Sequence, residues 1–491
     1  MLVSGFQPRS GVSGWLQFSS CLFRVADAPE PNRWATAHAC EILVEVLGDR
    51  RRYLVPALRP AAITPSAARL TESLRDIGYD FPAAVADIVD NSVMAGASQV
   101  EISIEFAGEE SYVVIADDGD GMTANGLLEA LRYGSRRTYG HRDLGRYGLG
   151  LKTASLSQCR SVTVVTNRQA TQSTLAVRTL DLDLIAQWDE WLVVEPPEDP
   201  VIARARERLA SAPGTAVIWR KLDRVLPEKR PDGGWARRRL DAMAAKAAEH
   251  LGIVFHRYLE SAADRGLVIT VNGMKVQPWN PFALNESTRN ELPLQRFEMT
   301  VGDVSGTVTL QRFVLPARDE FSSHEQFERH SGPLNWNRQQ GIYIYRADRL
   351  VQWGGWNGIR GIDEHTKLAR AALDFDTDLD SVFNINVAKM RVTLPPQIRQ
   401  MLERPINELC AHADDRYRKA SRRTDEGQPP ASASDRGSRP APTTPVLGGS
   451  DVGLALRAAA MQAGEYEAFR RIVSMLVQHS PGVANSLGLD R

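Results

Sequence analysis

Three polar motifs lie in a fixed order between Asp87 and Thr153, and each one adjoins an apolar segment of a different kind. The first lies on a helix-like segment that begins near Pro82, the second ends a strand-like run at 112–116, and the third leads into a short apolar helix. Along the chain, the pattern predicts two helices, two strands, a long loop, a helix and further strands. This order predicts an α/β sandwich with helices on one face of a mixed sheet.

Hydrophobic periodicity places the other elements in two successive units. The predicted strands are Val100–Phe106, Tyr112–Ala116, Ser161–Thr166, Thr215–Lys221, Thr307–Val314 and Gly341–Tyr345. Helices are predicted over 66–95, in two pieces, and over Ala236–Leu259. Asn272-Gly273 predicts a tight hairpin turn, because both residues tolerate a positive φ.

The first motif places Asp87 and Asn91 four residues apart, so both side chains project from one helical face. A carboxylate and a carboxamide in this arrangement orient a water and coordinate a hard cation through oxygen. A solvated helix face is the alternative for this pair taken alone. Asp90 lies about 100° away from that face, which favours a structural role.

The second motif, 117–122, runs from the end of a strand into two glycines that let the backbone turn sharply. Asp117 at the strand end is suited to accept the amino hydrogen of adenine, a contact that distinguishes adenine from guanine. Taken alone, the string also fits a calcium loop or a plain turn, although the later ligands of a calcium loop are missing.

The third motif, 145–155, is rich in glycine and leads into an apolar helix. Free backbone N–H groups at such a helix start favour a phosphate, with Lys152 adding charge and Thr153 a hydroxyl. The motif is neither a Walker loop, because G-K-[ST] is absent, nor a dinucleotide fingerprint.

Together the three motifs resemble the nucleotide-binding boxes of the GHKL superfamily, with the nearest likeness to MORC and MutL proteins. Pro213-Gly214-Thr215 and the stretch 341–351 extend the resemblance over about residues 66–400. It implies a two-layer α/β (α+β) sandwich of the GHKL (Bergerat) type, followed by a transducer-like α/β domain. It also implies ATP and Mg²⁺ as ligands.

The resemblance assigns roles residue by residue. Asp87 is expected to activate the attacking water, Asn91 to bind magnesium, and Lys389 to reach the γ-phosphate, with Lys367 as its rival. The residues expected to hold ATP are Asn91, Asp117, Gly119, Gly121, Met122, Ser135, Arg136, Gly145, Tyr147, Gly148, Leu149, Gly150, Leu151, Lys152, Thr153 and Thr215. The sequence departs from the family at two places: Asp87 stands where relatives carry glutamate, and Met94 where they often carry aspartate.

Composition shifts and the resemblance together divide the chain. The expected parts are an N-terminal extension at 1–60, a nucleotide-binding domain at 61–228, a transducer-like domain at 229–418, a linker at 419–450 and a C-terminal helical segment at 451–491.

Composition leaves the partners open. The net charge of −1 favours no polyanion, the four cysteines are scattered, and no apolar run approaches membrane length, so we expect a cytoplasmic protein. The resemblance implies an ATP-driven switch that dimerises with nucleotide and acts with DNA, in a restriction or anti-phage setting. The alternative is a non-hydrolysing ATP-binding scaffold that recruits a partner protein through its C-terminal helix. A histidine-kinase function is disfavoured, because His38 alone precedes the motifs and no dimerisation helix surrounds it.

Overall fold

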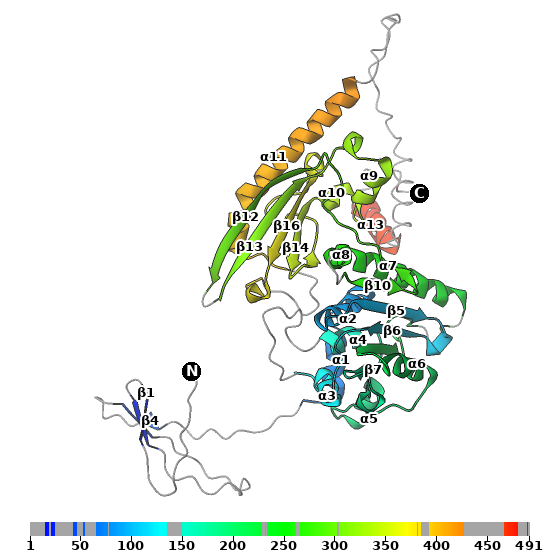
Figure 1. Cartoon of the computed structure of the whole chain (residues 1–491). Helices are drawn as coiled ribbons and strands as arrows, with labels where there is room; N and C mark the ends of the chain where they lie inside the picture. The colour runs from blue at the N-terminus through cyan, green and yellow to red at the C-terminus, as the bar shows by residue number, and fades with distance from the viewer. Residues whose placement is uncertain are drawn as a thin grey trace, which may run out of the picture. The chain divides into compact units, whose positions relative to one another are not determined.

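The computed structural model describes residues 15–18, 21–24, 43–46, 53–54, 65–76, 78–134, 150–227, 231, 233–261, 266–301, 304–380, 382–383, 392–426, 466–479 and 489. The chain divides into one unit that ends at Arg418 and a second that begins at Lys419. Figure 1 shows two sheets with their helices in the larger unit.

Seven strands form the first sheet. They are β5 (Gln99–Glu105), β6 (Tyr112–Asp117), β7 (Ser161–Asn167), β8 (Ala176–Asp181), β9 (Gly214–Arg220), β10 (Val268–Val271) and β11 (Met274–Lys275). Their order is β11-β10-β5-β6-β9-β7-β8, with β10 parallel to β5 and the other pairs antiparallel. The mixed sheet expected from the sequence is therefore confirmed. The sheet extends past residue 228, because β10 and β11 lie beyond the expected domain boundary.

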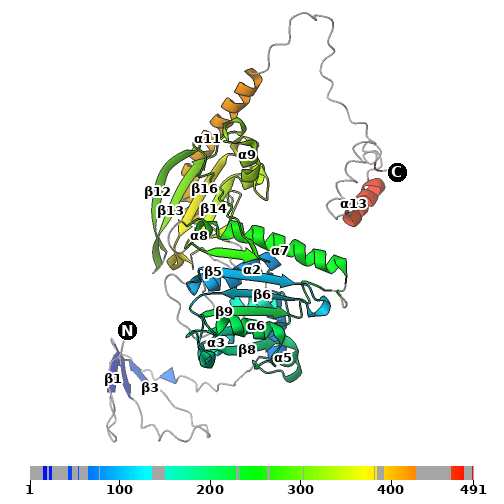
Figure 2. The ribbon, with the colours of Figure 1, turned by 45° about the vertical axis from the view of Figure 1, so that its right-hand side comes forward.

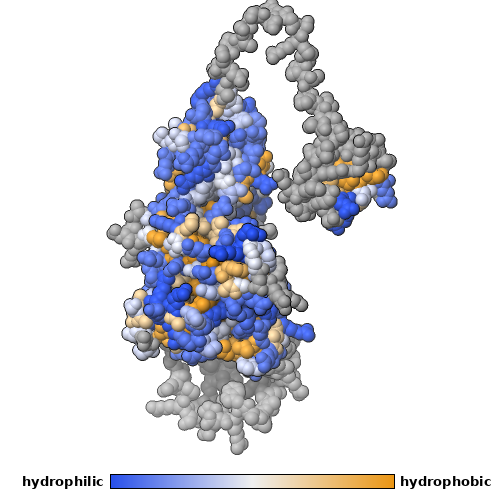
Figure 3. Space-filling model, turned by 90° about the vertical axis from the view of Figure 1, so that its right-hand side faces the viewer, coloured by the Kyte–Doolittle hydropathy of each residue, from blue (hydrophilic) through white to orange (hydrophobic). Residues whose placement is uncertain are grey.

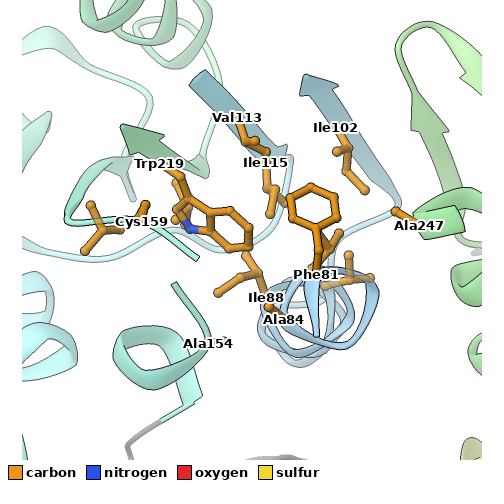
Figure 4. Packing of buried hydrophobic residues seen from close by; sticks show 14 of the residues in the cluster. Phe81, Ala84, Ile88, Ile102, Val113, Ile115, Ala154, Cys159, Trp219 and Ala247 are labelled. Carbon is orange, nitrogen blue, oxygen red and sulfur yellow. The ribbon is translucent and has the colours of Figure 1, made fainter. Parts of the chain in front are cut away.

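Four helices cover one face of this sheet: α1 (Ala67–Arg75), α2 (Phe81–Met94), α4 (Gly150–Leu156) and α7 (Gly234–Val254). Helix α2 is central, and its residues Phe81, Ala84 and Ile88 point into the core toward Trp219 and Ile115 (Figure 4). The rings of Phe81 and Trp219 meet edge to face at 6.0 Å between centroids. This packing holds α2 against β6 and β9.

A helix that the sequence analysis did not anticipate covers the opposite face. Helix α6 (Pro200–Leu209) buries Ile202, Ala205 and Leu209 against β7 and β9, and Figure 2 shows it in front of the sheet. Helices α3 (Ala124–Leu131) and α5 (Leu182–Trp188), which pack into the same core as α2, were also not expected. The sheet thus has helices on both faces, whereas the sequence predicted one covered face.

The second sheet has five strands: β12 (Asn290–Val301), β13 (Val304–Val314), β14 (Gly341–Arg346), β15 (Arg349–Gln352) and β16 (Ala369–Phe375). Their order is β12-β13-β16-β14-β15, with β14 parallel to β16. The long helix α11 (Pro396–Glu426) is tied to this sheet by Arg312, which donates to Glu408 at 2.6 Å. Helix α11 continues to Glu426, so the expected linker at 419–450 begins in helix. Between the sheets lies the short helix α8 (His256–Glu260), which follows α7.

Two smaller parts complete the description. The strands β1 (Trp15–Phe18), β2 (Cys21–Arg24), β3 (Leu43–Val46) and β4 (Tyr53–Leu54) form an antiparallel sheet within the stretch to which the sequence assigned no fold. In the second unit, α13 (Tyr466–His479) lies within the C-terminal segment for which helix was expected. Among the described helices, none is both long and apolar enough to cross a bilayer.

Candidate functional site

Helix α2 carries the first motif. It begins where Asp80 caps it, accepting a hydrogen bond from the Ala83 N–H at 2.9 Å, and Pro82 occupies the first turn. Asp87 is 1% exposed, whereas Asn91, one turn later, is exposed. The Asn91 amide nitrogen donates to the Asp87 carbonyl at 3.1 Å. The helix therefore presents a buried carboxylate beneath an exposed carboxamide.

Tyr79 and Gly150 lie close to the Asp87 carboxylate. The Tyr79 hydroxyl donates to its Oδ2 at 3.0 Å, and a Cβ on Gly150 would lie 2.6 Å from the same oxygen. Burial and the nearby Asp87 raise the pKa of Tyr79 far above its ordinary value, so the phenol remains a donor. Thr153, buried on α4, also hydrogen-bonds Tyr79. Tyr79 thus joins Asp87 of the first motif to Thr153 of the third.

Asp117 ends β6 as a buried acceptor, 7% exposed. Its Oδ2 accepts from the Ser92 hydroxyl at 2.8 Å, and its Oδ1 accepts from the N–H groups of Gly119 at 3.0 Å and Thr215 at 3.2 Å. Burial raises the pKa of Asp117, although these hydrogen bonds oppose the rise. One carboxylate therefore ties together α2, the second motif and β9.

The backbone turn after Asp117 requires glycine for steric reasons. Gly121 has φ +62°, and a Cβ there would lie 2.0 Å from the carbonyl oxygen of Asn167. The next N–H, that of Met122, donates to the Thr166 hydroxyl at 2.8 Å, and Thr166 lies 3.0 Å from the Thr215 hydroxyl. The turn is therefore pressed against β7 and β9.

Lys152, which the sequence predicts to hold phosphate, is buried in this structure. It is 1% exposed, its Nζ donates to the Ala130 carbonyl at 2.8 Å, and it lies 5.7 Å from the centre of the Tyr133 ring. Burial lowers the pKa of Lys152 to about 8, although Glu129 partly opposes this. In this structure the ammonium group is directed to the end of α3.

Several predicted residues lie outside the described part of the chain, namely Ser135, Arg136, Gly145, Tyr147, Gly148, Leu149 and Lys389. Their roles remain predictions. Leu151 is half-buried against the first core. Lys367 lies 3.3 Å from Glu364 and 4.9 Å from the Tyr417 ring on α11, and no contact with the residues around Asp87 is seen among those described.

Four contacting residues were not among the predicted site residues: Tyr79, Ser92, Thr166 and Arg349. Ser92 could have been found, because it follows Asn91 directly in the first motif. Tyr79 lies within the range, about residues 66–400, over which the resemblance extends. Arg349 lies in the stretch 341–351 that carried part of the resemblance, but nothing there indicated a contact with α2, and Thr166 gave no local signal.

Arg349, on β15 of the second sheet, forms a buried ion pair with Asp90 of α2. Its Nε donates to Asp90 Oδ1 at 2.6 Å, and the two side chains are 4% and 0% exposed. Removing one partner of such a pair costs about 3–5 kcal/mol, because the other charge is left buried. The structural role expected for Asp90 thus takes the form of a link between the two sheets.

The donor set can also be compared with the requirements of a divalent cation. Among the described residues, no group of three or more His, Cys, Asp and Glu side chains is placed to hold a metal. Magnesium at nucleotide sites takes few protein ligands and completes its shell with water and substrate phosphates. The exposed carboxamide oxygen of Asn91 fits such a single-ligand role.

Comparison with known proteins agrees with this geometry. Residues 79–214 match the family described as histidine kinase-, DNA gyrase B- and HSP90-like ATPase. A curated relative, ATPase morc-1 of Caenorhabditis elegans, is 30% identical over 94 residues. That match covers 19% of this chain and 11% of the relative.

The seven-stranded sheet with its covering helices, the motif positions and the family match agree on one class. Residues 79–214, which carry α2 and β6, are therefore similar to the GHKL superfamily of ATPases. The curated relative adds a likeness to MORC ATPases.

Proposed function

We propose that this protein binds ATP with Mg²⁺ at the site between α2, β6 and α4 and hydrolyses it as a conformational switch. The observation that carries the proposal is the buried Asp87 carboxylate, oriented by Tyr79, one helical turn before the exposed Asn91. A buried carboxylate with a fixed orientation is the group that general-base activation of a water needs.

Asp117 supports recognition of adenine. A carboxylate has roughly four acceptor positions on its two oxygens. Ser92, Gly119 and Thr215 donate to Asp117 in this structure. One position remains by this count, and an exocyclic amino group supplies the matching donor. A guanine carbonyl at the same place has no donor and would meet the carboxylate unfavourably.

The γ-phosphate end is assigned to Asp87 and Asn91. When bound, Mg²⁺ neutralises phosphate charge and orients the leaving group. Asn91 contributes its amide oxygen to the cation, and Asp87 takes the proton of the attacking water. The remaining phosphate contacts are those expected from the third motif, including Lys152, which must leave the Ala130 carbonyl to reach a phosphate.

Steady-state phosphate release from the full chain tests this function. Asp87→Asn should lower kcat by about 10²- to 10⁴-fold, the usual contribution of a general base, while ATP binding persists. Asp118→Asn is the matched control, because Asp118 is exposed and caps Ser98 and Gln99 instead. Equal phosphate release by wild type and Asp87→Asn would rule out Asp87 as the base.

The switch is proposed to work through a nucleotide-dependent homodimer. ATP can shift the equilibrium between monomer and dimer only through contacts that ADP does not make. The molar mass in solution, measured with ADP and with a non-hydrolysable ATP analogue, should double with the analogue alone. An unchanged mass would favour a scaffold instead.

DNA is the proposed macromolecular ligand, and its support on this chain is a basic segment of α7. Arg237 and Arg238 are exposed in its first turn. If they contact phosphates, DNA affinity should fall steeply with salt, and Arg237→Ala with Arg238→Ala should reduce the slope by about one per phosphate contact. A restriction or anti-phage setting is proposed from the family resemblance alone.

The scaffold alternative is favoured by one observation on α13. Ile472 and Met475 are 63% and 62% exposed, and Figure 3 shows a hydrophobic stripe between polar residues on this helix. A partner bound there should be lost with Ile472→Glu and Met475→Glu, while phosphate release from the first domain stays unchanged.

A further inference from the structure

The turn between β14 and β15 is held by three different elements outside its own hairpin. Its two central residues, Ala347 and Asp348, have φ values of +46° and +64°, which bends the chain tightly. The contacts, in chain order, are Arg346 with Asp380 at 2.6 Å, the Ala347 carbonyl with the Tyr258 hydroxyl at 2.6 Å, Asp348 with Arg257 at 3.0 Å, and Arg349 with Asp90 at 2.6 Å. We call residues 346–349 the junction turn.

Through Arg349, the junction turn contacts α2, the helix that carries Asp87 and Asn91. Asp90 lies on α2 between Asp87 and Asn91, about 100° around the helix from Asn91, and Arg349 meets it there. Because a helix turn is rigid, a shift of Asp90 moves Asp87 and Asn91 with it. Two contacts thus determine the position of the Asp87 carboxylate. Tyr79 contacts it directly within the first domain, and Arg349 of the second acts through Asp90.

Burial makes this link sensitive to movement. With side chains 4% and 0% exposed, neither charge has water to replace its partner if β15 moves away from α2. The arginine therefore distinguishes an arrangement in which the second sheet is seated against α2 from one in which it is displaced. A solvent-exposed ion pair would not make this distinction, because water would replace the lost contact.

We propose that Arg349 is a positioning residue of the ATP site, through which seating of the second sheet against α2 sets the rate of ATP turnover but not the affinity for ATP. This inference rests on the proposed ATPase function. In this proposal, the junction turn couples the position of the second sheet to the geometry of the ATP site.

Two measurements on the full chain test it. The first is kcat, KM and binding of a non-hydrolysable ATP analogue for Arg349→Gln, compared with wild type. The expected result is a fall in kcat of about 5- to 150-fold, the range of ordinary coupling between sites, with unchanged affinity for the analogue. The second is hydrogen exchange of the amides in 341–352, which the analogue should slow in wild type and leave unaffected in Arg349→Gln.

The controls separate coupling from loss of folding. Arg312→Gln removes another buried arginine of the second sheet, whose partner Glu408 lies in the same domain, so kcat should remain at the wild-type value. Asp90→Asn combined with Arg349→Gln neutralises both members of this ion pair, and keeps the test valid if a single variant does not fold. The double variant should lower kcat no more than Arg349→Gln alone, because both changes break one link. Arg349→Lys, which keeps the charge, should recover part of kcat.

The outcomes are distinct. An unchanged kcat and an unchanged exchange response in Arg349→Gln would overturn the inference, as would equal losses in Arg312→Gln. A wild type that binds the analogue without releasing phosphate would refute hydrolysis alone, and an exchange response that depends on Arg349 would still support the coupling. A wild type that binds no nucleotide would refute both proposals.

Discussion

Tyr79 donates a hydrogen bond to Asp87 over 3.0 Å, and both side chains are buried beneath the start of α4. Relatives that this chain resembles carry the longer glutamate at this position. Here Gly150 lies close to the same carboxylate oxygen, because a Cβ on Gly150 would be 2.6 Å from Asp87 Oδ2. The pairing explains how a carboxylate that is one methylene shorter keeps a single orientation.

Tyr79→Phe should therefore lower turnover more than it lowers binding. A hydrogen bond to a charged group is worth about 1.5–3 kcal/mol, and its loss frees the carboxylate to rotate. We expect kcat to fall by about tenfold or more, since each 1.36 kcal/mol is one factor of ten. Phosphate release is the measurement. Tyr112→Phe, on the distant start of β6, is the control, and equal rates in both variants would show that Tyr79 does not orient the base.

Asp117→Asn should weaken nucleotide binding and the fold together. The amide replaces one acceptor oxygen with a donor, so at least one of Ser92, Gly119 and Thr215 loses its partner. An unsatisfied buried group costs about 1–3 kcal/mol. Chemical denaturation and titration with ATP measure the two effects. Retained affinity for ATP in a folded Asp117→Asn protein would contradict the assignment of Asp117 to adenine.

Gly121→Ala should be far more disruptive than Gly96→Ala. Both glycines have a positive φ, +62° and +71°, so both variants carry similar backbone strain, about 1–2 kcal/mol. Only at Gly121 would the new Cβ meet backbone, the Asn167 oxygen at 2.0 Å, whereas nothing lies within 4 Å at Gly96. Thermal unfolding compares the two. Similar losses of stability would mean that the turn at Gly121 has room to relax.

The buried position of Lys152 should make the stability of the protein depend on pH. Its pKa is about 8 in the folded protein, mainly because of burial, and lies below the ordinary lysine value of 10.5. The unfolded chain therefore binds this proton more tightly than the folded protein. The free energy of unfolding should rise as the pH increases from about 8 toward 10.5, and below about pH 8 the buried charge should lower it.

Lys152→Met removes this contribution, so the difference between wild type and variant should shrink across that pH range. Denaturant titrations without nucleotide measure it. Lys246→Met replaces an exposed lysine of α7 and serves as the control. A constant difference between wild type and Lys152→Met at every pH would show that the ammonium group is not buried in solution.

The first motif shows how much local pattern predicts. Pro82 and the apolar spacing placed α2, and the i, i+4 relation placed Asp87 and Asn91 one turn apart, as found. Asn272-Gly273 likewise predicted its hairpin, with φ of +48° and +76°. Such features depend on backbone preferences of a few neighbouring residues, which the sequence contains in full.

Helix α6 carries a helix start signal in its sequence, although the helix was not predicted. Asp199 and Pro200 are a helix start signal, and Asp199 caps the N–H groups of Val201 and Ile202 at 2.8 and 3.0 Å. Its apolar face was not anticipated because a second covered face of the sheet was not expected. Residues 135–149, which include the start of the third motif, lie outside the described part of the chain.

By itself, the sequence determined the order of the motifs and the class of fold that such an order allows, and it named Asp117 and Asp87 as candidate site residues. Tertiary structure alone decided the direction of Lys152 toward Ala130, the support of Asp87 by Tyr79, and the pairing of Asp90 with Arg349 across 259 positions of chain. The physical reason is that backbone conformation follows from near neighbours. The contacts of a buried polar side chain depend instead on which distant groups packing brings within hydrogen-bonding distance.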